Sequence, residues 1–94
     1  MIIRILGEGQ FTVDDAHADV LNALDSGLER AVESNDEEGF RVALRDLLAQ
    51  VRTTGEPLPL DALEPSDSVL PGEDSTVDEV RAMLEASTEG LIPG

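Results

Sequence analysis

The sequence has no cysteine, no tryptophan and no tyrosine, and it holds only two phenylalanines. Without cysteine, a disulfide framework, a thiolate metal site and a cysteine nucleophile are excluded. Leu, Val, Ile and Ala side chains therefore have to build the core. No apolar run approaches the roughly 18 residues of a transmembrane helix, and no cationic segment precedes an apolar run as in a signal peptide. We expect a cytoplasmic protein without direct membrane insertion.

Basic residues are also scarce, since six arginines and no lysine stand against 21 acidic residues, for a formal net charge of −15. Because phosphate contacts need lysine and arginine, this balance argues against direct binding of nucleic acid or of an anionic membrane. The acids are spread along the chain rather than gathered in one tail, which is typical of a solvated acidic surface. A face for a basic partner and adaptation to high salt are the alternatives.

Short apolar runs at the start of the chain predict a β-hairpin over 2–13. The first run, 2–6, is rich in β-branched residues and ends at Gly7. The glycines of the segment 7–9 suit a tight turn, because glycine adopts positive φ without strain. The second run, 10–13, alternates polar and apolar residues, which is the pattern of a half-buried strand.

Two amphipathic helices are predicted next, over 15–34 and 36–54. In each, apolar residues recur at 3-4-3 spacing and make one stripe. Asp14 and Asp36 stand where helix N-caps belong. The short connection makes the helices antiparallel neighbours. Gly27 lies within the first helix, where it weakens the helix by about 1 kcal/mol relative to Ala and would permit close approach of another helix.

Four prolines exclude a helix from 56–75, which is predicted as a Pro-rich loop. A short third strand over 66–70 would support the hairpin, because a lone two-stranded hairpin is only marginally stable. A last helix is predicted over 76–87. Thr76 and Glu79 form a capping box at its start.

These elements fit one domain over residues 1–94, of the α+β class. The N-terminal β-hairpin, with or without the short third strand, packs on the antiparallel helical hairpin, and the C-terminal helix completes the fold. The two helical stripes either pack on each other and on the sheet, or leave one seam partly open for a partner's helix.

Side chains capable of catalysis occur singly or have a structural explanation. His17 is the one histidine, and a general base needs an orienting carboxylate and a nucleophile within reach. A zinc site needs several His or Cys ligands. Acid pairs such as Asp14-Asp15 and Glu37-Glu38 stand at predicted helix N-termini, where they bond free backbone N–H groups. We therefore expect no enzyme, no cofactor and no metal site.

Several pieces of the sequence, in their order along the whole chain, resemble one known family. They are the opening MIIRILGEGQ at 1–10, Asp14-Asp15, Pro57-Leu58-Pro59, the run PSDSVLP at 65–71 and the closing GLIPG at 90–94. In these pieces the chain resembles the PspA-associated domain family (PspAA), small proteins of actinobacteria and some archaea. The resemblance implies a companion of phage shock protein A, the coiled-coil, membrane-remodelling effector of bacterial envelope stress. It implies no catalytic residue, because the family has none established.

The resemblance leads to a non-enzymatic interaction module that binds a phage-shock-protein-A-like coiled-coil protein and acts on the membrane only through it. An acidic domain could compete with anionic lipid for basic stretches of such a partner, and the competition should weaken with salt. One alternative is a homodimer, in which an exposed edge strand of the hairpin pairs across a two-fold axis. Another is a cation or small-ligand sensor that uses the acidic loop 61–74.

The candidate interaction residues lie in two short segments. The first segment could form a rigid loop that faces the partner, or a loop that packs across the helical hairpin and completes the core. The apolar pair near the C-terminus has the same two interpretations. The candidates are Pro65, Ser66, Asp67, Leu70, Pro71, Leu91 and Ile92.

Overall fold

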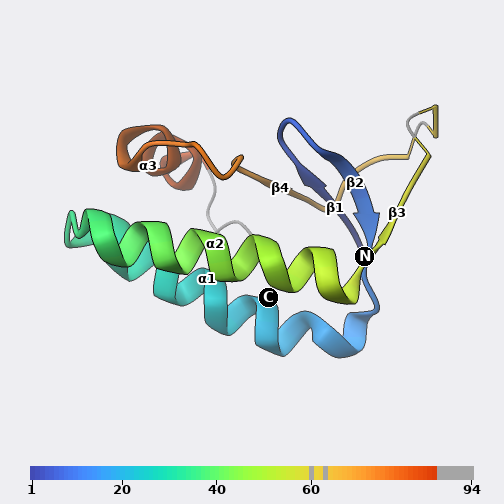
Figure 1. Ribbon diagram of the computed structural model, residues 1–94, viewed down its shortest axis with the longest axis horizontal. Coiled ribbons are helices and arrows are strands. Elements are labelled where there is room, and N and C mark those ends of the chain that lie inside the picture. The colour runs from blue at the N-terminus through green and yellow to red at the C-terminus, as the bar shows by residue number, and fades with distance from the viewer. Residues whose placement is uncertain (60, 63, 87–94) are drawn as a thin grey trace.

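The computed structural model describes residues 1–59, 61–62 and 64–86. Helices α1 (Ala18–Glu33) and α2 (Glu37–Thr54) form an antiparallel pair. A small sheet and helix α3 (Val77–Glu85) lie next to each other on one side of this pair (Figure 1). The described part of the chain is therefore a two-layer α+β structure, and the predicted fold class is confirmed.

The sheet has four strands in the order β3-β2-β1-β4. Strands β1 (Ile2–Ile5) and β2 (Gly9–Thr12) form the predicted antiparallel hairpin, and β4 (Ser68–Leu70) runs parallel to β1. The two-residue strand β3 (Glu56–Pro57) pairs antiparallel with β2. The sequence predicted the β4 region as an optional strand but placed β3 in a loop, because a two-residue strand has no pattern of its own.

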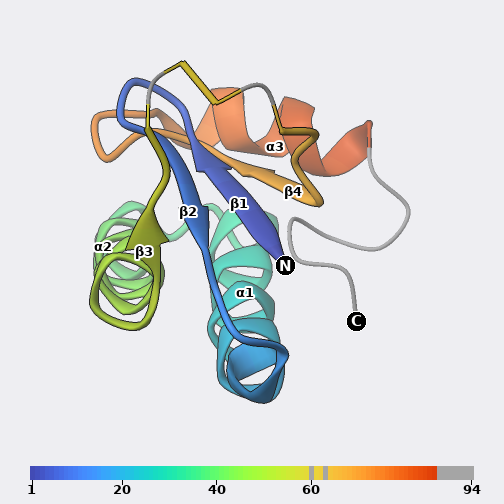
Figure 2. The same cartoon turned by 90° about the vertical axis from the view of Figure 1, so that its right-hand side faces the viewer.

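The hairpin strands are the two inner strands of this sheet, as the view in Figure 2 shows. Strand β4 covers the free side of β1, and β3 covers part of the free side of β2. The expectation that the hairpin offers an exposed edge for two-fold pairing is therefore wrong. The prolines that exclude a helix from the segment between α2 and α3 do not prevent short pieces of it from adding to both sides of the hairpin.

Polar side chains cap the helices at the positions that the sequence predicts. Asp36 Oδ1 accepts a hydrogen bond from the Gly39 backbone N–H at 3.0 Å. Thr76 and Glu79 exchange the two bonds of a capping box at the start of α3. Asp14 caps a 3-10 turn rather than an α-helix, so that α1 begins three residues later than expected. Each cap satisfies backbone donors that the helix itself leaves open.

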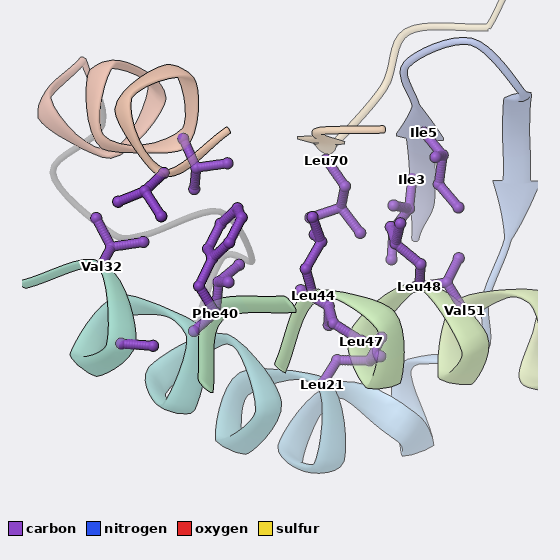
Figure 3. Packing of buried hydrophobic residues seen from close by; sticks show 14 of the residues in the cluster. Ile3, Ile5, Leu21, Val32, Phe40, Leu44, Leu47, Leu48, Val51 and Leu70 are labelled. Carbon is purple, nitrogen blue, oxygen red and sulfur yellow. The ribbon is translucent and has the colours of Figure 1, made fainter. Parts of the chain in front are cut away.

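The core lies between the helical pair on one side and the sheet and α3 on the other (Figure 3). Both apolar stripes of the helical pair are buried in it, so they pack on each other and on the sheet, and neither leaves its seam open to a partner. Apart from Phe40, the buried apolar side chains are aliphatic, as the composition requires. The core is formed by Ile3, Ile5, Val13, Leu21, Leu28, Ala31, Val32, Phe40, Leu44, Leu47, Leu48, Val51, Leu70, Val77 and Val80.

Two glycines in the helical pair have opposite surroundings. A Cβ at Gly27 would meet no heavy atom of the described residues within 4 Å, so no neighbouring helix of that part of the chain uses the space. A Cβ at Gly39 would lie 2.9 Å from Asp36 Cγ, within the N-cap of α2. The expectation of close helix approach at Gly27 is therefore wrong for the described fold.

This difference predicts opposite outcomes for the same substitution. Gly27→Ala should raise the free energy of unfolding by about 0.5–1 kcal/mol, because it restricts the unfolded chain and fills open space. The melting temperature should rise by roughly 4–8 °C per kcal/mol in a chain of this size. Gly39→Ala, the matched control, should give no gain, since its Cβ displaces the Asp36 cap. Equal gains in thermal melts of the two variants would contradict this assignment.

Candidate protein-interaction site

Five of the predicted interaction residues lie in the segment 65–71, which leads into strand β4 and fastens it to β1. Asp67 holds Ile2 by two bonds: the Ile2 N–H donates to Asp67 Oδ2 at 2.7 Å, and the Asp67 N–H donates to the Ile2 carbonyl at 2.7 Å. These bonds precede the parallel register in which Ile3 lies opposite Ser68. Asp67 thus fixes where β4 begins along β1, a structural task for a residue that the sequence named as a candidate contact.

The segment before β4 crosses the outer face of the sheet, on the side away from the helices. We call residues 58–67 the strap; of these, 60 and 63 lie outside the described residues. In Figure 2 the strap arches over β2 and β1. It is tied down by Gln10, whose Nε2 donates to the Glu64 carbonyl at 2.6 Å and to Ser66 Oγ at 2.8 Å.

Gln10 is a residue that the sequence gave no reason to single out. In the hairpin register it lies opposite Arg4, on the outer face where a polar side chain is expected to be in water. It is nevertheless only 6% exposed, because the strap covers it. Its backbone carbonyl also accepts from the Leu58 N–H at 2.9 Å. No local sequence pattern predicts that a segment more than fifty residues away returns to cover Gln10.

The other candidates divide between the core and the surface. The Leu70 side chain is 0% exposed and belongs to the core, and Pro71 is buried beside it. Pro65 and Asp67 are exposed, and Ser66 is half-buried. Leu91 and Ile92 lie outside the described residues. The geometry of the loop thus agrees with completion of the core at Leu70, whereas contact with a partner stays a prediction for these residues.

A shallow, open groove of about 460 Å³ lies between the strap and the sheet. Strap residues make its apolar walls, and Arg4 and Gln10 belong to its lining on the sheet side. Val69, which pairs with Arg4 in register, is 39% exposed nearby. The groove is lined by Arg4, Gly9, Gln10, Leu58, Pro59, Ala62, Glu64 and Pro65.

The segment that contains the strap is acidic. Between Arg52 and Arg81 the sequence has eight acidic residues and no basic one. Three of the acids belong to the strap and are exposed to solvent. An apolar groove with an acidic rim is suited to a basic, amphipathic segment of a partner. The eight acids are Glu56, Asp61, Glu64, Asp67, Glu73, Asp74, Asp78 and Glu79.

One ion pair joins the hairpin turn to the end of α2. Arg52 binds both carboxylate oxygens of Glu8, through Nε to Oε1 at 2.9 Å and through Nη2 to Oε2. Its Nη1 also lies 3.8 Å from Glu73 Oε1, beyond β4. The hydrogen bond from Arg52, aided by the charge of the guanidinium, holds the pKa of Glu8 below its ordinary value against a smaller opposing effect of desolvation. The arrangement is a bidentate structural clamp.

Two further kinds of feature, a metal site and a membrane-spanning helix, can be searched for among the described residues. Within residues 1–59, 61–62 and 64–86, no group of three or more His, Cys, Asp or Glu side chains is placed to hold a metal ion. Over the same residues, none of the helices combines the length and the apolar character that crossing a bilayer takes.

The tie between Gln10 and the strap predicts a measurable loss of stability. Gln10→Met keeps the side-chain length but removes the amide donor, so the free energy of unfolding should fall by about 1–3 kcal/mol. Arg4→Met, on the same face but exposed, is the control and should change it by roughly 0.5 kcal/mol or less. Urea denaturation of both variants gives the comparison. Equal midpoints for the two variants would show that the strap is not held by this residue.

The clamp predicts a pH-dependent contribution from Glu8. Because its pKa is lowered in the folded state, ionised Glu8 stabilises the fold above its ordinary pKa. This contribution is lost as pH falls through the lowered value. The pair is one-third exposed, so Glu8→Gln should cost about 1 kcal/mol or less at neutral pH and nearly nothing at roughly pH 3. Asp46→Asn, in an exposed pair with Arg45, should cost little at either pH. A Glu8→Gln difference that stays constant with pH would argue against the clamp.

Comparisons with known proteins place these features in a family. The chain matches the family model PspAA, described as PspA-Associated protein, over residues 1–94. Comparisons with curated proteins and with solved structures find no match. Since the family model covers the chain from its first residue to its last, the chain belongs to the PspA-associated protein family, PspAA.

Proposed function

We propose that this protein is a non-enzymatic module that binds a PspA-like coiled-coil protein and tunes its assembly or its engagement of the membrane. The observation that carries the proposal is the family match over residues 1–94, because the family is described by association with PspA. In this proposal the protein works in the cytoplasm as part of the envelope stress response. It reaches the membrane only through its partner.

The side chains that are chemically capable of catalysis have structural roles in this fold, which supports a binding function rather than a catalytic one. Ser66 Oγ accepts the amide of Gln10, and the carboxylate of Glu8 is occupied by Arg52. His17 ends the 3-10 turn that leads into α1. Each of these groups holds one segment of the fold against another or shapes a turn, and a general base needs a different setting, with a nucleophile in reach.

The acidic strap and its groove give the proposal a physical basis. A PspA-like partner that uses basic stretches to hold anionic lipid would meet the carboxylates of Asp61, Glu64 and Asp67 in place of lipid phosphates. Such competition depends on Coulomb attraction between exposed groups, which salt screens over about 10 Å at 0.1 M. Binding of this protein would then release the PspA-like partner from the membrane surface.

Light scattering after size exclusion tests the proposal directly. The protein is run alone, and then mixed with the purified PspA-like protein of the same organism, at low and at high salt. We expect a complex whose mass exceeds that of either component, and the run of the protein alone gives its own oligomeric state. An unrelated coiled-coil protein serves as the control and should give no complex. The absence of a complex with the PspA-like protein at both salt concentrations would overturn the proposal.

A further inference from the structure

We draw no further inference here: the strongest candidate, the groove between the strap and the outer face of the sheet, belongs to the site already described, and because its lining sets the basic Arg4 against the acidic Glu64, nothing in the structure shows what covers it.

Discussion

The parallel pairing of β4 with β1 is the constraint on which the rest of the structure depends. Two strands that run in the same direction need a crossover, and the α1–α2 pair lies within that crossover. Ile3 and Ile5 of β1 and Leu70 of β4 then face the same helices. Asp67 sets the register by holding both backbone groups of Ile2. Without this pairing the hairpin would lose one of its neighbours, and α3 would have no fixed starting point beside the sheet.

The helical pair and the sheet bury one interface between them, so each layer has one outer face. These two outer faces differ. The outer face of the sheet is partly covered by the strap, which Gln10 ties down through its side-chain amide and its carbonyl. The solvent side of the helical pair has no such cover within the described part of the chain, and the space beside Gly27 is open there. The acids do not follow this division, since they stand at the N-termini of the helical pair as well as between Arg52 and Arg81. The two outer faces thus differ in how far another segment of the chain covers them.

Local features of the fold could be predicted from the sequence, and long-range ones could not. The hairpin turn, the helical stripes and the Asp36 and Thr76 caps each depend on residues within a few positions of one another. Strand β3 and the burial of Gln10 depend on contacts between distant segments, for which neither periodicity nor capping gives a signal. The candidate residues within the segment 65–71 rest on a family pattern. The structure shows what several of them do within the fold, and this explains why such a pattern cannot by itself distinguish contact from scaffold.

A small domain is only marginally stable, with a free energy of unfolding of about 5–10 kcal/mol for a chain of this size. At most positions the chain follows the rules that stabilise helices: caps are filled, stripes are buried and acids stand at N-termini. Departures from these rules without a compensating contact are therefore informative, because natural sequences break local rules most often where function requires it. Gly27 within α1 is such a departure, because no heavy atom of the described residues uses the space beside it. The exposed Val20 and Val42 are not such departures, because single apolar side chains are common on protein surfaces and Leu6 and Val69 are exposed to a similar degree.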